Sequence, residues 1–439
     1  MASIQQSRFA LLALGLGTSL PAADSAVNVA LPAIADALLT DPLAIRWTVI
    51  VYVLTYASLM MVLGAWGDRQ GYWRVFRFGL WLGVLAYTWC SLAGSYGELL
   101  AGRFLQGLSS ALLLSVGPAL MVQCLGDSHP SRGIAVYGAL SALAAASGPL
   151  IGGIMIDWLG WSGSFWFRVP VVALAMLCLG IASTRGFGLG PLSGLNTVAS
   201  SESNKPNHAD VNTSVNVVVL RQIFGEHCRG PMARAHALHA WAQSCGFTSM
   251  LLIPFFVTKV IGLSPSWLGL MLFAWPFGMV MGNSLGPWLI RQIPLSMCFR
   301  VGLILLALGG SGLAAICLGS GTQQDSAWPL AAISWAIGVC LLTQGMGLGL
   351  FQMLYTDWVL AQSLASQRGV AGAASLTSRT AGVILTALCW PALIAALLEH
   401  VDLTWSMALG LLYLVGSLSL LALLSQIPQQ SISMRAHPR

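Results

Sequence analysis

Long apolar stretches separated by short polar turns constrain the fold of this chain more than any other feature of its sequence. Each stretch holds roughly 20 residues, the length at which an α-helix crosses about 30 Å of hydrocarbon. Charged residues make up only 8% of the chain, against roughly a quarter in soluble domains. The sequence therefore predicts an all-α membrane protein with twelve transmembrane helices, at residues 9–38, 46–66, 74–94, 98–124, 133–156, 164–184, 232–257, 265–289, 297–319, 328–354, 369–397 and 403–425.

A polar segment at residues 185–230 is the one long interruption of this pattern. It is too polar to cross a membrane or to build a core. We expect it to be a cytoplasmic linker between an N-terminal six-helix bundle, residues 1–184, and a C-terminal six-helix bundle, residues 231–439. Residues 9–23 also resemble a signal peptide, but the apolar stretch continues through Ile34, so we interpret them as part of the first span.

The net charge of +6 raises the question of a nucleic-acid partner, and the distribution of the charge answers it. With both termini inside, fifteen of the twenty basic residues fall in cytoplasmic segments, and the outer loops hold only Arg46 and Lys259. This is the positive-inside pattern of membrane proteins. We therefore expect a multi-pass protein of the inner (cytoplasmic) membrane with both termini cytoplasmic and no nucleic-acid partner.

Nine cysteines are scattered along the chain without a CxxC pair or a His-Cys cluster at zinc spacing. No disulfide framework and no metal site are indicated. Because no sequence resembles a nucleotide-binding loop, we expect no ATP site, no cofactor and no enzymatic activity. The lipid bilayer is an expected partner from the apolar spans, whereas a small-molecule substrate and protons are the partners that the resemblance given below implies, with the chain acting as a monomer.

The loop between the second and third spans, "GAWGDRQGYWR", combines glycines with an acidic and a basic residue. Glycine permits a sharp turn, and the family resemblance given below implies that the Asp and the Arg at this place bond across to the other bundle and hold one face closed. We expect a gating loop formed by Gly64, Gly67, Asp68, Arg69, Gly71 and Arg74. The alternative is a loop that sets topology without gating.

Two charged residues lie inside predicted spans. Asp24 is the only acidic residue deep in an apolar stretch, and Arg103, in "RFLQGLSSA", has comparable depth. An Arg at the centre of a spanning helix costs at least about 2.5–3.5 kcal/mol, so it should face water or a carboxylate. Burial favours the neutral carboxyl and a nearby Arg favours the carboxylate, so we expect this pair to couple transport to protons. The alternatives are a snorkelling Arg103 and a purely structural Asp24.

The fifth span contains "AASGPLIGG", in which Gly148, Pro149, Gly152 and Gly153 are closely spaced. Small residues four positions apart let helices approach closely, and a proline inside a helix permits bending. We therefore expect this segment to pack tightly against a neighbouring helix.

These segments together resemble the major facilitator superfamily, and most closely its drug/proton antiporter (multidrug efflux) branches. The loop resembles the pattern G-x-L-A-D-R-x-G-R-K, although Tyr72 and Trp73 replace two of its basic positions. "RFLQG" matches R-x-x-Q-G, and the fifth-span segment resembles G-x-x-x-G-P-x-x-G-G, which marks export in the family. The resemblance implies two six-helix bundles that expose a central cavity to each side of the membrane in turn.

Further polar residues inside spans are candidates for the substrate cavity. His239 and Gln243 share one face of the seventh span with His236, since their spacing follows the helical repeat. The predicted cavity residues are Asn28, Gln106, His239, Gln243, Gln344 and Arg379. The alternative for the two histidines is packing or an interfacial position. Arg168 is expected either to alter the outer mouth or to pair with Asp157.

The predicted function is secondary active transport, with proton-coupled export of an amphipathic small molecule or drug. Two alternatives stay open from the sequence. One is uptake or facilitated diffusion of a small nutrient on the same fold, and the other is a membrane sensor or receptor that has lost transport.

Overall fold

A computed structural model of the chain describes residues 2–41, 44–125, 130–184, 230–319, 329–362, 368–400 and 405–423. Every regular element in these ranges is helical, which confirms the all-α fold. The first half holds α1 (Ala2–Ala22), α2 (Ser25–Ala37), η1 (Ala44–Arg46), α3 (Trp47–Gln70), α4 (Tyr72–Leu92), α5 (Tyr96–Leu125), α6 (Pro130–Leu159), α7 (Gly163–Trp166) and α8 (Arg168–Thr184). The second half holds α10 (Gly230–Phe255), η3 (Phe256–Ile261), α11 (Pro265–Gln292), α12 (Leu295–Gly319), α13 (Leu330–Gln362), α14 (Arg368–His400) and α15 (Trp405–Leu423).

The lengths of these helices agree with the predicted spans. Within the described ranges, ten helices are long and apolar enough to cross a membrane, and the bent pair Phe9–Ala22 and Ser25–Ala37 forms a further candidate span. The shorter apolar helix Met407–Leu423 lies at the twelfth predicted span. The predicted linker, residues 185–230, lies outside the described residues apart from Gly230.

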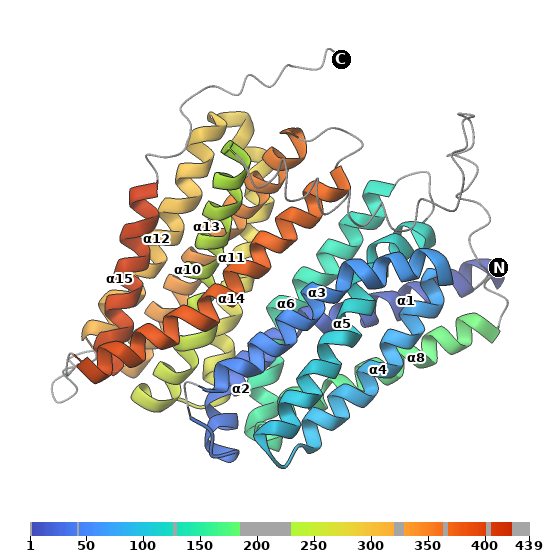
Figure 1. The fold of residues 1–439 in the computed structure, drawn as a ribbon, viewed down its shortest axis with the longest axis horizontal. Helices are drawn as coiled ribbons and strands as arrows, with labels where there is room; N and C mark the ends of the chain where they lie inside the picture. Colours follow the sequence, from blue (N-terminus) through green and yellow to red (C-terminus); the bar gives the residue numbers. More distant parts are fainter. Residues whose placement is uncertain are drawn as a thin grey trace.

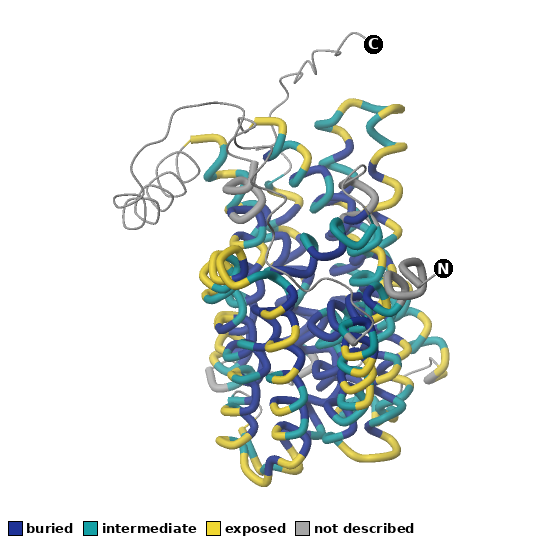
Figure 2. The backbone as a smooth tube through the Cα atoms, turned by 90° about the vertical axis from the view of Figure 1, so that its right-hand side faces the viewer, coloured by how far each residue is buried: buried dark blue, intermediate teal, exposed yellow. Residues whose placement is uncertain are grey.

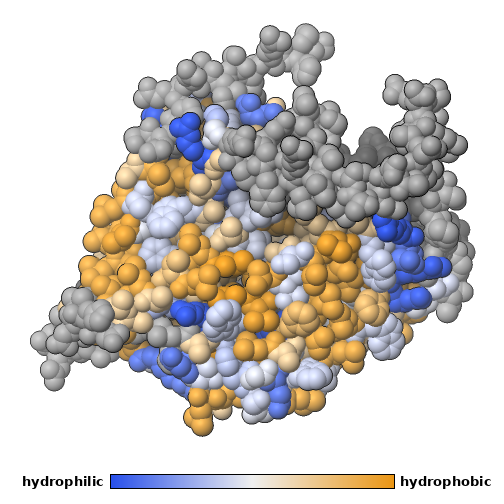
Figure 3. Space-filling model, in the orientation of Figure 1, coloured by the Kyte–Doolittle hydropathy of each residue, from blue (hydrophilic) through white to orange (hydrophobic). Residues whose placement is uncertain are grey.

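The outer faces of the helices carry large apolar side chains. Trp81, Leu85, Trp158, Trp335 and Leu418 are all exposed. Figure 3 shows hydrophobic residues over much of one face of the molecule, and Figure 2 shows the buried stretches gathered in the interior. A soluble protein rarely exposes so much contiguous apolar surface, whereas helices that face lipid tails do so along their length.

The helices form two groups that follow the order of the sequence. Figure 1 shows the blue to green helices of the first half beside the lime to red helices of the second. The two groups touch through α6 and α11, α2 and α10, and α3 and α14. A site formed at these contacts is therefore shared by both halves.

The first predicted span differs from its expected form, because it is broken rather than continuous. α1 and α2 meet at an angle of 44° at Ala23 and Asp24. Pro21 lies one residue before the end of α1, and a proline removes one backbone donor and crowds the preceding turn. At the break the backbone turns through short-range hydrogen bonds, from Asp24 N–H to the Pro21 carbonyl oxygen and from Ala26 N–H to the Ala23 carbonyl oxygen.

Candidate functional site

The helix break places the Asp24 carboxylate among donors from two other helices, α5 and α8. Arg103 of α5 donates from Nη1 to Asp24 Oδ1 at 2.7 Å and from Nη2 to Oδ2 at 2.9 Å. Gln106, one turn further along α5, donates its Nε2 to Oδ1 at 2.8 Å. The fork of two parallel bonds between a guanidinium and a carboxylate is a strong, orienting arrangement. The structure thus brings together the two residues predicted to couple protons, and Gln106 with them.

Arg103 is held on every side by the first half. Its Nε donates to the Thr48 carbonyl oxygen at 2.8 Å, and its Nη1 also donates to Gln106 Oε1 at 2.8 Å. The guanidinium lies 4.3 Å from the centre of the Tyr52 ring. Arg103 is fully buried, so the alternative in which it snorkels outward is wrong.

Arg168 completes this cluster, which corrects the expectation that it pairs with Asp157. Its Nη1 donates to Asp24 Oδ1 at 3.1 Å, and its Nη2 donates to the Ala23 carbonyl oxygen at 2.9 Å. The same carbonyl oxygen also accepts from the Ala26 backbone N–H at 3.1 Å, so Arg168 adds a second donor to it. Asp157 instead accepts from the backbone and the hydroxyl of Ser266 in α11. The same cost argument that singled out Arg103 applies to Arg168, but the sequence does not show its partner.

The charges in this cluster do not balance. Two buried guanidiniums share one carboxylate, whose side chain is 14% exposed. Breaking a buried ion pair by removing one partner typically costs about 3–5 kcal/mol, because the remaining charge is left without compensation. Asp24 therefore holds both arginines in place, and its side chain is more exposed than that of either arginine.

The glycine-rich segment of α6 packs against the helix break on one side and the second half on the other. A Cβ atom at Gly148 would meet the Ala23 carbonyl oxygen at 3.0 Å and would also meet Ser25 Oγ. A Cβ atom at Gly152 would lie 2.7 Å from Ala26 Cβ. Gly153 faces the Pro265 backbone of α11 with similar closeness. The Pro149 backbone also lies against Gly269 of α11. The segment therefore contacts the helix break beside Asp24 on one side and the second half on the other.

In the second half, the predicted face of α10 lies against α13 and α14. His236 Nδ1 bonds to Tyr355 Oη, and His239 Nδ1 lies 2.8 Å from Ser378 Oγ. The His239 ring stacks on Tyr355 with centroids 4.0 Å apart. Both His239 and Gln243 are only 1% exposed. Among the described residues, His239 Nε2 and Gln243 Oε1 have no hydrogen-bond partner.

Arg379 of α14 lies at the junction of the two halves. It is exposed, yet its charge acts on both Tyr56 of α3 and His239 of α10. Tyr56 also interacts with the Thr380 side chain, and its ring packs edge-on against Tyr52 at 5.2 Å. Ring contacts therefore lead from Arg103 through Tyr52 to Tyr56, which lies on α3, a helix that α14 contacts. Sequence analysis did not find Tyr52 or Tyr56, which carry no charge to single them out.

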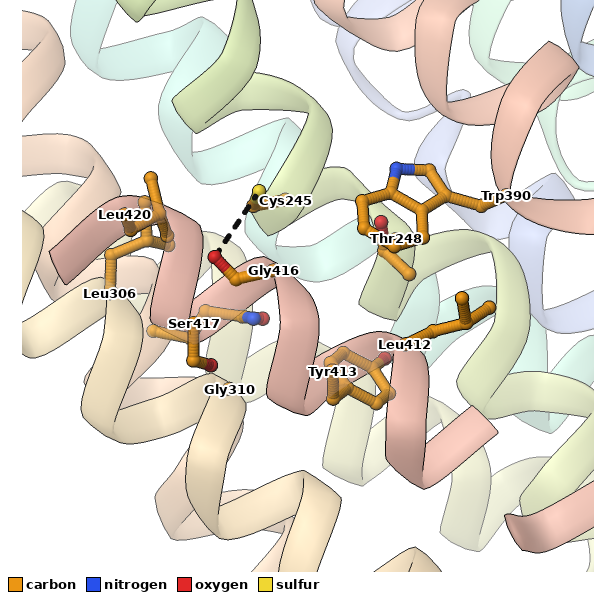
Figure 4. Close-up of a pocket in the computed structure, with 11 residues that line it drawn as sticks. Cys245, Thr248, Leu306, Gly310, Trp390, Leu412, Tyr413, Gly416, Ser417 and Leu420 are labelled. Atoms are coloured by element: carbon orange, nitrogen blue, oxygen red, sulfur yellow. Dashed lines mark hydrogen bonds between the residues drawn. The ribbon is translucent and has the colours of Figure 1, made fainter. Parts of the chain in front are cut away.

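Two predicted cavity residues lie elsewhere. Asn28 is buried within α2, and Gln344 is 2% exposed inside the second half. Ser249 Oγ donates to Gln344 Oε1 at 2.5 Å and Tyr413 Oη donates to Ser249 Oγ at 3.1 Å. Gln344 also lines a cavity, shown in Figure 4, between Thr248, Trp390 and Tyr413. The helices around this cavity all belong to the second half.

We expect Gln344→Leu to lower stability without changing substrate affinity. The substitution leaves Ser249 with no acceptor, and an unsatisfied buried polar group costs about 1–3 kcal/mol. The thermal unfolding midpoint of the purified variant and its substrate dissociation constant check this. A large loss of affinity at unchanged stability would place Gln344 in the substrate cavity instead.

The gating loop forms a tight turn between α3 and α4. Gly71 has φ 90°, a backbone conformation that side chains disfavour. Tyr72 Oη donates to Asp68 Oδ1 at 2.5 Å, so the tyrosine that replaces a basic residue of the family pattern bonds to Asp68 within the loop. Gly67 lies against Val116 of α5, Gly64 lies near Ser115, and Arg74 is exposed.

We expect Asp68→Asn to reduce the transport rate several-fold while the protein still inserts into the membrane. The amide can still accept the Tyr72 hydrogen bond, but the negative charge expected to bond across to the other bundle is lost. Transport rates normalised to the amount of membrane-inserted protein check this. A wild-type rate would show that Asp68 sets topology without gating.

The two halves are joined at the ends of α2, α6 and α11 that the charge distribution predicts to face outward. Lys259 Nζ, in η3, donates to the Asp36 carboxylate of α2 at 2.6 and 2.5 Å. Asp157, near the end of α6, bonds to Ser266 at the start of α11. These contacts and the close approach of Gly153 to Pro265 close the predicted outer side.

Comparison with known proteins agrees with this architecture. The model of the Major Facilitator Superfamily matches residues 12–387. The uncharacterized transporter YebQ of Escherichia coli is 25% identical over 418 residues, which cover 86% of this chain and 88% of that protein. The drug efflux pump JefA of Mycobacterium tuberculosis is 34% identical over 174 residues, 39% of this chain and 34% of the pump.

The fold is also that of a solved transporter. A bacterial homolog of the human lysosomal transporter Spinster, in an inward-facing and unoccupied conformation, superposes with a TM-score of 0.66 at 17% identity, over 96% of this chain and 95% of that one. The likeness to drug-efflux proteins predicted from the motifs is confirmed at the level of the family. With a family model that spans most of its length and a transporter fold, the chain belongs to the major facilitator superfamily of membrane transporters.

Proposed function

We propose that this transporter exports an amphipathic small molecule in exchange for protons, by alternating access between two six-helix bundles. The observation that carries the proposal is Asp24, a carboxylate in the break of the first span, bound by Arg103, Gln106 and Arg168. Such a carboxylate can hold a proton in one conformation and an ion pair in the other. Proton coupling by Asp24 and Arg103 is the central element of this account.

The direction of transport rests on the α6 segment and on the relatives. The segment at Gly148, Pro149, Gly152 and Gly153 resembles the family pattern that marks export, and JefA is named a drug efflux pump. We place the protein in the inner membrane with both termini cytoplasmic, and we divide it at a cytoplasmic linker, residues 185–230. The contacts between Lys259 and Asp36 then close the outer side of a state that is open toward the cytoplasm.

Energised vesicles test the proposal directly. A panel of fluorescent amphipathic compounds is presented to inverted and to right-side-out membrane vesicles from cells that overproduce the protein. We expect at least one compound to accumulate in energised inverted vesicles, and the accumulation to collapse when a protonophore is added. Accumulation only in right-side-out vesicles would show uptake, and specific binding without any movement would indicate a sensor.

A further inference from the structure

The interior of this transporter carries an excess of positive charge. Among the arginines of the spanning helices, Arg103 and Arg168 are fully buried, and Arg379 lies eleven residues beyond the first residue of α14. Asp24 is the acidic residue that the structure places among them, and it is bound to two of the three. In the part of the chain that the structure describes, no acidic side chain pairs with Arg379. An arginine in a spanning helix is costly unless it has a function or a partner.

The position of Arg379 gives this charge access to a substrate. Its neighbours Ser378 and Thr380 are buried, while Arg379 itself is exposed. α14 contacts both α3 of the first half and α10 of the second, and the Arg379 charge acts on Tyr56 and His239 of these two helices. We therefore place the guanidinium where the halves meet. A guanidinium offers hydrogen-bond donors and no acceptor. It binds two oxygens of a carboxylate or a phosphate at once.

Beside Arg379, two buried polar atoms also lack partners. We assign the Nδ1–H tautomer to His239, because the Ser378 hydroxyl donates to the Ser375 carbonyl oxygen at 2.9 Å and its oxygen then accepts from His239 Nδ1. In this neutral tautomer His239 Nε2 is a lone pair without a donor, as is Gln243 Oε1 one turn further along α10. Buried acceptors of this kind are ordinarily satisfied. They point to a ligand group that brings a hydrogen-bond donor.

From Arg379, His239 and Gln243 we infer that the substrate of this transporter is an amphipathic organic anion that also carries a hydrogen-bond donor. The anionic group binds Arg379, the donor is accepted by His239 and Gln243, and the Tyr52 and Tyr56 rings receive the apolar part. The inference rests on the proposed function in one respect, since it takes this anion to be the substrate that the transporter moves. A cation is disfavoured because Arg379 carries no neutralising carboxylate and the charge of Asp24 is already shared by two guanidiniums.

A matched pair of fluorescent probes tests the charge. Dansyl-glycine and dansyl-cadaverine share one fluorophore and one sulfonamide N–H, but the first ends in a carboxylate and the second in an ammonium group. Each is titrated against the purified full-length protein in lipid nanodiscs, with energy transfer from tryptophan as the signal. We expect dansyl-glycine to bind saturably and more tightly than dansyl-cadaverine.

Variants assign the site. Arg379→Gln should weaken dansyl-glycine binding at least about tenfold, since a charged hydrogen bond is lost. Arg379→Lys should weaken it less, and Arg291→Gln, which removes an exposed arginine at the end of α11, should leave it unchanged. His239→Phe keeps the stacking on Tyr355 and should weaken dansyl-glycine, but not dansyl-sarcosine, which lacks the N–H.

Three results would overturn the inference: tighter binding of dansyl-cadaverine, unchanged dansyl-glycine binding in Arg379→Gln, or no saturable binding of either probe. The failure of the proposed function looks different. If dansyl-glycine binds through Arg379 but no compound accumulates in energised vesicles, the anion-binding site is confirmed and the proposed export is wrong.

Discussion

Asp24→Asn is expected to abolish accumulation driven by a pH gradient, while the protein still inserts into the membrane. Asparagine keeps one acceptor for Arg103 but can neither release a proton nor carry the charge that both arginines share. Burial opposes the ionised carboxylate and the guanidiniums favour it, so a conformational change that alters either term loads or releases a proton. The measurement is the accumulation ratio of a transported compound in proteoliposomes with only a pH gradient imposed.

The same substitution should also lower thermal stability, because two buried guanidiniums are left facing a neutral amide. For this reason the accumulation ratio is normalised to correctly folded protein, measured by size-exclusion chromatography. Asp357→Asn is the matched control. Asp357 is an exposed residue of α13, so its variant should accumulate the compound like the wild type. If the Asp24→Asn protein still concentrates the compound, Asp24 is not the coupling residue.

Gly148→Leu is expected to reduce transport to background. Even the first atom of a side chain at this position would press on the backbone of Ala23, and the whole leucine must displace α6 from the helix break. That break holds Asp24 in register with Arg103 and Arg168, so its displacement disturbs the ion cluster as well as the packing. Initial transport rates, together with the yield of folded protein, measure the effect.

Gly138→Leu provides the control on the same helix. A Cβ atom there would have no neighbour within 4 Å, so the added leucine should be tolerated with near wild-type transport. Equal loss of transport in both variants would mean that α6 tolerates no large residue anywhere. Normal transport in Gly148→Leu would show that the resemblance to the export pattern has no role in this chain.

The fold could be predicted from the sequence because hydrophobic length alone determines where a helix can cross a bilayer. The break in the first span could not, since Pro21 alone does not distinguish a kinked helix from a broken one. The pairing of Asp24 with Arg103 could be predicted, because burying either charge alone in a spanning helix costs free energy that an ion pair reduces. Arg168 carries the same cost but lies at the edge of its predicted span, where an outer partner looked equally suitable.

In the second half, helical periodicity predicts which residues share a face of one helix, but it does not predict which neighbour that face contacts. The helical spacing of His239 and Gln243 correctly predicted a shared face, because positions along one helix have fixed directions. Gln344 has the same polarity, yet it faces the interior of its own half, since the rotation of α13 is set by packing against neighbouring helices. The contact between α3, which carries Tyr56, and α14, which carries Arg379, joins residues more than 300 positions apart, a separation over which sequence pattern carries no geometric information.

The central claim is that substrate movement and proton movement are linked through Asp24. Proteoliposomes that contain the purified protein and an internal pH-sensitive dye are loaded with a compound that accumulates in the vesicle assay, and are then diluted into medium without it at equal pH and with the membrane potential clamped. The account predicts that efflux of the compound acidifies the interior in the wild type and leaves the internal pH unchanged in Asp24→Asn. Efflux from the wild type with no change of internal pH, or acidification that persists in the variant, would contradict it.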